Sequence, residues 1–487
     1  MAQPDIQLPE LLSTIHQQAS FRDKASTIGI IFGIKSPRNV VVTGLSALTP
    51  IGSSVESFWQ GLLKMKSGVI PFDVGNWRTS IAAPVAYFNP ANHFTPKELR
   101  QISRPEAMGI KLVRDALKSA AAEQDGQIRL GINRTRVGNY FSTGYGGAAR
   151  IIEVHDTLCR EVAGVVDLKT NSERVGPILS RQLMPEQVNG MVGIYTGARG
   201  SGGNPIQACA TSLTSATEGA ESVFIGNNDM AIVGGLEELL GVSPYDYYGP
   251  ESIAIFASTR GALSTRNHDP EGASRPFDKD RDGFVLASGG GALILEEEQH
   301  ALKRSAPIYA RVLGFHNNQD GHMPTQLYIP NVALTLVKAC MDRQTEEPYP
   351  FNAFFAHATS TQAGDVAEAN AFRVACAVLG MDETTIPITA IKSMVGHMAG
   401  GSGAANLVAT VMALRRGKIP AIRNLENPDP DVADLMLVKD HYLERNIRTA
   451  LATAYGFGGF NAAMLLGKYI RRFSRRYYQR GFLANAA

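Results

Sequence analysis

Three residues of this chain have side chains and surroundings suited to covalent catalysis, and the first is a cysteine. Cys209 lies in the segment QACATS at 207–212, with a glycine-rich stretch at 197–203 before it and small residues after it as far as Phe224. This pattern predicts a sharp turn into a tightly packed helix that begins at the cysteine. A thiol at a helix N-terminus lies at the positive end of the helix dipole, which lowers the pKa of the thiol and favours the thiolate. A buried structural cysteine would give the same pattern.

The other two residues are histidines at the ends of predicted strands. His357 ends an apolar run and opens HATST at 357–361, and His397 lies in the glycine turn IKSMVGHMAGGSGA at 391–404. Each histidine alone is explained by a core residue with satisfied hydrogen bonds. One cysteine and two histidines, all at strand ends beside glycines or small residues, together favour nucleophilic catalysis through the thiol.

The remaining cysteines and glycine turns suggest no metal or nucleotide site. Cys159, Cys340 and Cys376 show no C-x-x-C spacing and no Cys/His cluster, so we expect no metal. The glycine turn at 144–147 lacks both the G-x-G-x-x-G spacing and the lysine of a phosphate-binding loop. We interpret it as a turn or a close packing contact.

The elements that must position these residues alternate between strand and helix, which predicts an α/β fold. The same rhythm recurs in both halves of the chain and indicates an ancient duplication, although no repeat is visible residue by residue. Apolar runs and helical periodicity predict strands at 39–45, 137–143, 230–234, 292–296, 308–315, 353–358, 386–391 and within 451–466, and helices at 54–63, 105–122, 297–304, 330–341, 365–377 and 403–415.

Four segments differ in character along the chain. Residues 1–38 form an N-terminal extension, 39–298 a half that carries the cysteine, 299–467 a half that carries both histidines, and 468–487 a basic tail without an acidic residue. We interpret the tail as a solvated basic segment, with docking to an acidic partner or a membrane surface as the alternative.

Composition excludes several classes of function. The chain has 47 basic and 45 acidic residues, so its formal net charge is +2 and nothing requires nucleic acid as a partner. No apolar run approaches the roughly 18–20 residues that span a bilayer. The short apolar run at 28–34 lacks the basic region and cleavage site of a signal peptide. We expect a cytoplasmic protein whose cysteines are reduced.

Nine segments of the chain resemble the β-ketoacyl-acyl-carrier-protein synthases of the thiolase-like superfamily, in particular the chain-elongating type. They occur in the family's order and at its spacing, and they cover about residues 38–467. The segments are VVVTGLSALTPIG at 40–52, QACATS at 207–212, IVGGLE at 232–237, GALSTRN at 261–267, SRPFDKDRDGFV at 274–285, HATSTQAGD at 357–365, IKSMVGHMAGGSGA at 391–404, IPAIRNLENPDP at 419–430 and YGFGGFN at 455–461.

The resemblance implies a fold, a reaction and partners. The fold would be a five-layered α/β/α/β/α body of two similar halves, as a homodimer or, alternatively, a heterodimer. The reaction would be the decarboxylative Claisen condensation of an enzyme-bound acyl group with a malonyl thioester, in fatty-acid or polyketide chain elongation. The partners would be an acyl carrier protein and its acyl and malonyl thioesters. No cofactor would be bound by the chain itself, because phosphopantetheine arrives on the carrier protein.

The resemblance also implies roles for individual residues. Cys209 would take the acyl group, and His357 and His397 would contact the malonyl thioester carbonyl and promote loss of carbon dioxide. The backbone N–H groups of Cys209 and Phe457 would form the oxyanion hole. Phe457 would also be the gating aromatic residue, and Thr359 and Thr361 would line the phosphopantetheine and malonyl channel.

A buried polar network is implied around the histidines, formed by Lys392, Asp365 and Glu368. A nearby ammonium helps to keep an imidazole neutral. The chain departs from the family pattern at four positions: Gln207 and Phe460 replace threonines, and Ser288 and Asn406 replace glutamates. We expect these departures to change the electrostatics around Lys392 and the shape of the acyl pocket.

Rival interpretations share the fold. A starter-unit synthase has asparagine in place of the second histidine, and a thiolase has a second cysteine near its end, whereas none follows Cys376 here. A non-catalytic subunit similar to the chain-length factors lacks the nucleophilic cysteine and typically has glutamine in its place, so Cys209 argues against it. A subunit that requires a different partner remains the alternative hypothesis. A binding protein that uses the fold only as a scaffold is disfavoured by the complete set of three residues.

Overall fold

A computed structural model represents the chain and describes residues 37–73, 77–146, 148–162, 165–175, 182, 184–240, 250–259, 261–342 and 347–470. Most of the predicted extension at 1–38 and of the predicted basic tail at 468–487 lies outside the described residues, which begin at 37 and end at 470. Within the described ranges, no helix is long and apolar enough to cross a membrane.

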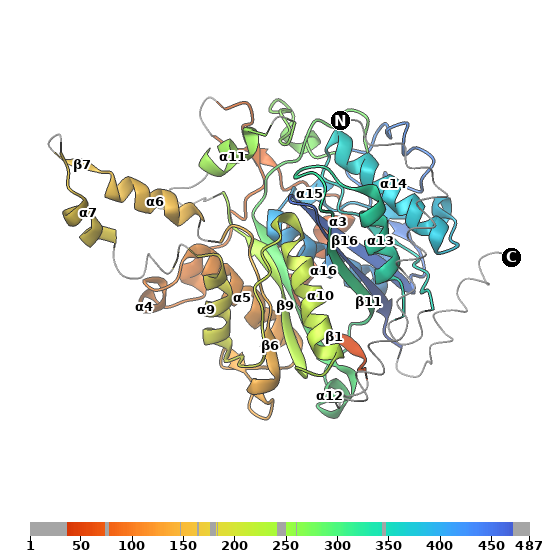
Figure 1. The fold of residues 1–487 in the computed structure, drawn as a ribbon, viewed down its shortest axis with the longest axis horizontal. Helices are drawn as coiled ribbons and strands as arrows, with labels where there is room; N and C mark the ends of the chain where they lie inside the picture. Colours follow the sequence, from red (N-terminus) through yellow and green to blue (C-terminus); the bar gives the residue numbers. More distant parts are fainter. Residues whose placement is uncertain are drawn as a thin grey trace.

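A nine-stranded mixed sheet runs through the body (Figure 1), in the order β13-β12-β16-β17-β11-β1-β10-β9-β6. Strands β1 and β11 pair only through residues 40–42 of β1, so the sheet divides there into two halves. The strands are β1 (Val40–Leu48), β6 (Val137–Asn139), β9 (Met230–Glu237), β10 (Gly289–Glu297), β11 (Ala310–Gln319), β12 (Phe354–Phe355), β13 (Ile388–Thr389), β16 (Thr449–Gly456) and β17 (Phe460–Lys468).

The two halves of the sheet have the same arrangement about this junction. Reading outward, the N-terminal half is β1, β10, β9 and β6, and the C-terminal half is β11, β17, β16 and β12, with β13 added at its edge. In both halves the two inner pairs are antiparallel and the next pair is parallel. The alternation of strands and helices in both halves of the sequence predicted this equivalence.

Helices form three layers around the two halves of the sheet. Between them lie α10 (Thr211–Phe224) and α16 (Ser402–Arg416), which pack against each other and against strands of both halves. The outer layers are α5 (Arg104–Ser119) with α9 (Glu186–Thr196) on one side and α13 (Ile329–Ala339) with α14 (Gln362–Val378) on the other. The five-layered α/β/α/β/α fold is therefore confirmed. Small side chains dominate α10 and α16, which lets two sheet halves pack on one central layer.

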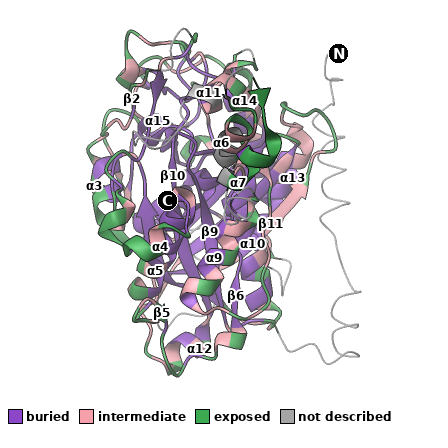
Figure 2. Ribbon diagram, turned by 90° about the vertical axis from the view of Figure 1, so that its left-hand side faces the viewer, coloured by how far each residue is buried: buried purple, intermediate pink, exposed green. Residues whose placement is uncertain are grey.

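The remaining helices have four to eleven residues each, and the remaining strands have two. Figure 2 shows β9 and β10 as buried strands and more exposed residues on the peripheral helices. The helices are α3 (Val55–Leu63), α4 (Pro96–Leu99), α6 (Ala148–Leu158), α7 (Leu168–Val175), α11 (Pro250–Ala257), α12 (Glu298–Lys303) and α15 (Lys392–Val395), and the strand pairs are β2 (Ile70–Pro71) with β3 (Ile81–Ala82), β4 (Glu123–Gln124) with β5 (Gln127–Ile128), β7 (Glu161–Val162) with β8 (Val165–Val166), and β14 (Lys418–Ile419) with β15 (Leu443–Glu444).

The predicted helices are all present, but three predicted strands are shorter than expected. The run at 137–143 contains only β6, which ends at Asn139. The runs at 353–358 and 386–391 contain only the two-residue strands β12 and β13. One reason is local: the backbone N–H groups of His357 and Ala358 donate to the carboxylate of Glu368 rather than to a neighbouring strand. The predicted strand material at 451–466 is a hairpin of β16 and β17.

Candidate active site

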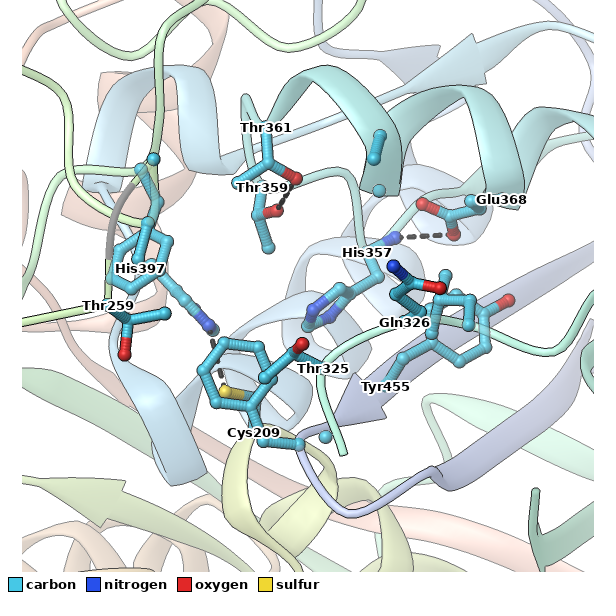
Figure 3. A pocket seen from close by; sticks show the side chains of 18 of the residues that line it. Cys209, Thr259, Thr325, Gln326, His357, Thr359, Thr361, Glu368, His397 and Tyr455 are labelled. Atoms are coloured by element: carbon cyan, nitrogen blue, oxygen red, sulfur yellow. Dashed lines mark hydrogen bonds between the residues drawn. The ribbon is translucent and has the colours of Figure 1, made fainter. Parts of the chain in front are cut away.

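The three candidate catalytic residues meet in one pocket of about 540 Å³ between the two halves of the molecule (Figure 3). Cys209 comes from the N-terminal half, and His357 and His397 come from the C-terminal half. Thr359, Thr361, Phe457 and Glu368 line the same pocket. The sequence therefore predicted a set of residues that the fold brings together from distant parts of the chain.

Cys209 lies in a sharp turn that leads into α10, as predicted. It is the middle residue of a 3-10 turn at 208–210, and α10 begins directly afterwards. Ala208 has a φ of +48°, in the left-handed region that a residue with a side chain rarely adopts. Such a conformation costs on the order of 1 kcal/mol and persists only where the surroundings impose it. Gly456 lets this turn approach the end of β16 closely, because a Cβ at that position would lie 2.4 Å from the carbonyl oxygen of Gln207.

The protonation state of the nucleophile differs from the expectation. The pKa of the Cys209 thiol is raised to about 12, mainly because the sulfur is buried. The ammonium of Lys392 and the backbone N–H groups of Phe457 and Cys209 oppose this rise. Burial therefore outweighs the groups that favour the thiolate, so the pKa of the thiol lies above and not below its usual value, and the resting cysteine is protonated at neutral pH.

His397 contacts the nucleophile directly. Its Nε2 lies 3.0 Å from the sulfur of Cys209, and its Nδ1 lies 3.0 Å from Oγ of Ser402. Its backbone N–H donates to the carbonyl of Val285 at 2.7 Å, and its ring packs edge-on against Phe284 with the ring centroids 5.1 Å apart. The ring is thus held on both sides, with one nitrogen facing the sulfur.

His357 lies beside His397, with the ring centroids 5.4 Å apart and the ring planes nearly perpendicular. Nζ of Lys392 is 3.3 Å from Nδ1 of His357 and also donates to its backbone carbonyl. Burial, reinforced by the charge of Lys392, lowers the pKa of both imidazoles well below the usual value. Both histidines are therefore neutral at physiological pH, as the chemistry implied by the resemblance requires.

Glu368 and Lys392 form a buried pair of opposite charge behind His357. Glu368 accepts hydrogen bonds from the backbone N–H groups of His357 at 2.8 Å and Ala358 at 2.7 Å, and from the hydroxyl of Thr453 at 2.9 Å. Burial raises the pKa of the Glu368 carboxyl and lowers that of the Lys392 ammonium, while each charge favours the other. The pair fixes the backbone that carries His357.

Asp365 performs a similar task for the loop that follows His357. Its carboxylate accepts from the backbone N–H groups of Phe277, Thr359 and Ser360 at 2.9–3.1 Å, with Nε of Arg281 3.7 Å away. Burial raises the pKa of this carboxyl to about 6. Asp365 thus ties the loop to the segment around Phe277 rather than contacting the histidines.

The residues predicted to form the channel and the oxyanion hole line the pocket. Phe457 follows β16, is 38% exposed and lines the pocket. Its backbone N–H and that of Cys209 both hydrogen-bond the sulfur, so two backbone donors converge at the nucleophile. The hydroxyl oxygens of Thr359 and Thr361 lie 3.1 Å apart on the pocket wall.

Ser288 and Asn406 stand where the family pattern has glutamates, and each side chain hydrogen-bonds a neighbouring group. Ser288 donates to Glu238 at 2.8 Å, and Glu238 forms an ion pair with Arg104 at 3.1 Å. The amide of Asn406 donates to the backbone carbonyls of Phe355 at 2.9 Å and Thr453 at 3.3 Å. A carboxylate could not donate to these carbonyls, so Asn406 fits this backbone.

The other two departures are Gln207, directly before the turn that carries Cys209, and Phe460, directly after the turn between β16 and β17. Oε1 of Gln207 accepts a hydrogen bond at 2.6 Å from the hydroxyl of Thr214, the fourth residue of α10. Phe460 begins β17 and packs against the central core, and its ring lies next to Gly458. Neither residue lines the pocket.

Sequence reasoning missed two residues that hold the site together. Ser402 contacts His397, as described above. Glu237, at the end of β9, accepts hydrogen bonds from the backbone N–H groups of Gly144 at 3.0 Å, Tyr145 at 2.9 Å and Gly400 at 3.1 Å. The signal for Glu237 was present, because a glutamate directly after a buried strand requires partners and the glycine turn offers N–H groups.

Comparison with known proteins finds that the chain is similar to β-ketoacyl synthases in sequence and fold. The family model "Beta-ketoacyl synthase, N-terminal domain" matches residues 37–301, and "Beta-ketoacyl synthase, C-terminal domain" matches residues 309–426. The 3-oxoacyl-[acyl-carrier-protein] synthase 2 of Synechocystis sp. is 34% identical over 436 residues, which cover 89% of this chain and 98% of that protein. The protein of the same name from Coxiella burnetii is also 34% identical, over 88% of this chain and 99% of that protein.

Two solved structures share the fold at a similar level. A β-ketoacyl synthase from Burkholderia phymatum has a TM-score of 0.77 and 27% identity, with 89% of this chain and all of that chain covered. A type II polyketide ketosynthase, in complex with its acyl carrier protein and bound to the hexaketide, has a TM-score of 0.76 and 26% identity at the same coverage.

Proposed function

Because the chain belongs to the β-ketoacyl synthase family, we propose that it condenses an acyl group bound to Cys209 with a malonyl unit on an acyl carrier protein, using His357 and His397. It is an acyltransferase of fatty-acid or polyketide chain elongation. The observation that carries the assignment of residues is the distance of 3.0 Å between the Cys209 sulfur and Nε2 of His397, with His357 alongside.

The first half-reaction transfers the acyl group to Cys209. Its sulfur attacks the thioester carbonyl of the acyl carrier, and the resulting oxyanion is held by the backbone N–H groups of Cys209 and Phe457. The bond to the pantetheine sulfur then breaks, and that sulfur leaves as a thiol carrying the proton that balances the one lost by Cys209. The N–H donors around the sulfur lower the cost of forming the thiolate from a thiol whose pKa is about 12.

The second half-reaction makes the carbon–carbon bond. His357 and His397 donate hydrogen bonds to the malonyl thioester carbonyl, the bond to the carboxylate breaks, and its electron pair forms an enolate as carbon dioxide leaves. The enolate carbon attacks the acyl carbonyl, the bond to the Cys209 sulfur breaks, and the sulfur leaves as a thiolate that takes up a proton from solvent. Because both imidazoles are neutral, they stabilise the enolate without forming an ion pair that would hold the malonyl carboxylate in place.

Phosphopantetheine enters this proposal as part of the carrier protein, so the chain itself needs no bound cofactor. The paired hydroxyls of Thr359 and Thr361 on the pocket wall fit the amide groups of the phosphopantetheine arm. The carrier protein is the proposed partner, since one structural relative is a ketosynthase in complex with such a protein. We assign the reaction to the cytoplasm, because the nucleophile must remain a free thiol.

We further propose that the chain forms a dimer through the edge of the N-terminal half. β6 is the outermost strand there, and large apolar side chains are exposed nearby, with Ile194 69% and Ile206 47% exposed. The segment at 200–203 hydrogen-bonds the carbonyls of β6, and the exposed apolar residues beside this edge favour association. Native mass spectrometry of the chain alone should give twice its 52.4 kDa mass. A monomer that becomes active only with a second, related subunit would instead favour the heterodimer.

Acyl loading tests the proposed function directly. The intact mass of the protein would be measured after incubation with acyl-carrier thioesters of several chain lengths, for the wild type, Cys209→Ala and Cys159→Ala. Cys159 is an exposed thiol and controls for non-specific acylation. We expect a gain of one acyl group in the wild type and in Cys159→Ala and none in Cys209→Ala. No gain with any primer would favour a subunit that depends on a partner.

A further inference from the structure

Ser402 lies directly behind His397. It is the first residue of α16, five positions after His397, and only 3% of it is exposed. Its Oγ is 3.0 Å from Nδ1 of His397, on the side of the ring opposite the nitrogen that faces Cys209. In a neutral imidazole one ring nitrogen carries the proton and donates, and the other accepts. The direction of the hydrogen bond between Ser402 and Nδ1 therefore decides which nitrogen of His397 carries the proton.

The direction of this hydrogen bond follows from the needs of the hydroxyl. Within the part of the chain that the structure describes, Nδ1 of His397 is the one hydrogen-bond partner of Ser402 Oγ. If Nδ1 donated to the oxygen, the buried hydroxyl proton would have no acceptor, which costs free energy. If the hydroxyl donates to Nδ1, both groups are satisfied. The second arrangement places the imidazole proton on Nε2, the nitrogen that faces Cys209.

His357 is held in the same way by a different group. Nζ of Lys392 is 3.3 Å from Nδ1 of His357, and an ammonium group can only donate. Nδ1 of His357 therefore accepts, and its proton too lies on Nε2. The two neutral rings would thus present two N–H donors to one thioester carbonyl, one fixed by an ammonium and the other by a hydroxyl.

We propose that Ser402 is a positioning residue that holds His397 in the Nε2–H tautomer, in parallel with the action of Lys392 on His357. A hydroxyl fixes the tautomer without adding a charge next to the ring, so His397 stays neutral. The catalytic consequence rests on the proposed function, whereas the tautomer itself does not.

The tautomer can be measured without any activity. Protein labelled with ¹⁵N-histidine would be studied by two-bond ¹H–¹⁵N correlation spectra, with His397→Gln used to assign the signal. We expect His397 to be protonated at Nε2 in the wild type and in Ser402→Thr, and to be a mixture of tautomers in Ser402→Ala. Protonation at Nδ1 in the wild type, or an unchanged Nε2–H tautomer in Ser402→Ala, would overturn the proposal.

Kinetics then test the consequence for the reaction. In Ser402→Ala, kcat for decarboxylation of malonyl-carrier thioester should fall by about five- to tenfold, the size of one neutral hydrogen bond, with little change in KM. Ser402→Thr should restore it. Ser46→Ala is the matched control, because Ser46 is also 3% exposed but donates to Leu112 in the outer layer. A wild type without decarboxylation would count against the proposed function, and the spectra would still decide the tautomer.

Discussion

At the scale of single residues, the Cys209 sulfur is subject to opposing electrostatic effects. Its place before a helix and the nearby ammonium of Lys392 favour the thiolate, while its burial and the carboxylate of Glu237 favour the thiol. Burial prevails, and the pKa is raised to about 12. The sequence identified the residue because a cysteine before a run of small residues is a local pattern. It could not identify the protonation state, because depth of burial depends on the assembled fold.

This balance predicts how the reactivity of the thiol depends on pH. At pH values far below the pKa of the thiol, the thiolate fraction rises about tenfold for each pH unit. The rate of alkylation follows this fraction, because the thiolate is the reactive form. In a Cys159→Ser background, the rate of Cys209 alkylation by iodoacetamide should rise about tenfold per unit from pH 7 to pH 9 without a plateau. The other two cysteines are buried and should not interfere. A plateau below pH 8 would mean that the helix N-terminus and Lys392 outweigh burial.

The departures from the family pattern show a similar limit of sequence reasoning. Positions 288 and 406 could be recognised as places where carboxylates are missing, but their partners could not. Ser288 contacts Glu238, and Asn406 donates to two backbone carbonyls that a carboxylate would repel. These contacts join residues that are 47–51 positions apart. They become visible only when the strands are assembled.

At the scale of elements, the site depends on turns more than on regular structure. The helices were predictable because their apolar periodicity spans several turns. The strands β6, β12 and β13 were overestimated. For β12 the carboxylate of Glu368 binds the backbone N–H groups that a longer strand would have used. Glu237 likewise joins the glycine turn after β6 to the turn that follows His397. Carboxylate-to-backbone hydrogen bonds thus fix several turns of the site.

The turn that carries Cys209 is held by close contact with the end of β16. A Cβ at Gly456 would lie 2.4 Å from the carbonyl oxygen of Gln207 and 3.2 Å from the backbone nitrogen of Cys209. Gly456→Ala should therefore lower the free energy of unfolding by about 1–3 kcal/mol, as overpacking does. It should also reduce the rate of acyl loading by more than about tenfold at a temperature where the variant is folded, because positional errors of about 1 Å at a reacting atom have effects of this size.

The matched control for this variant is Gly190→Ala. Gly190 lies in α9, and a Cβ there would have no atom within 4 Å. Alanine is the better helix former, so this variant should keep or gain stability and load normally. Chemical denaturation and intact mass would measure both properties. A Gly456→Ala protein that loads at the wild-type rate would show that the turn does not depend on β16.

At the scale of the whole molecule, the active site is assembled across the duplication. The N-terminal half supplies the nucleophile at the start of α10, and the C-terminal half supplies both histidines, one of them just before α16. Alternating strands and helices predicted two similar halves. They could not predict that α10 and α16 share one central layer, because that contact joins segments about 190 residues apart, as in the hydrogen bond from Ala404 to Ser212.

The spacing of these two helices should therefore control both the stability and the chemistry of the protein. Gly403 is the second residue of α16, and a Cβ there would lie 2.8 Å from Cβ and 2.9 Å from the backbone nitrogen of Leu213 in α10. The backbone of Leu213 cannot rotate away from the new methyl group as a flexible side chain could. Gly403→Ala should therefore push the two helices apart by a few tenths of an ångström. The same movement should lengthen the contact between Cys209 and His397.

We expect Gly403→Ala to lower the free energy of unfolding by about 1–3 kcal/mol and to slow both acyl loading and malonyl decarboxylation in the folded protein. Gly190→Ala again provides the comparison, since both substitutions offer the same gain in helix propensity and differ in the contact that the new methyl group meets. Denaturant unfolding and the two half-reactions, measured on the same samples, would test this. Unchanged half-reactions in a destabilised Gly403→Ala protein would mean that the geometry of the site is set locally within each half, and not by the central layer.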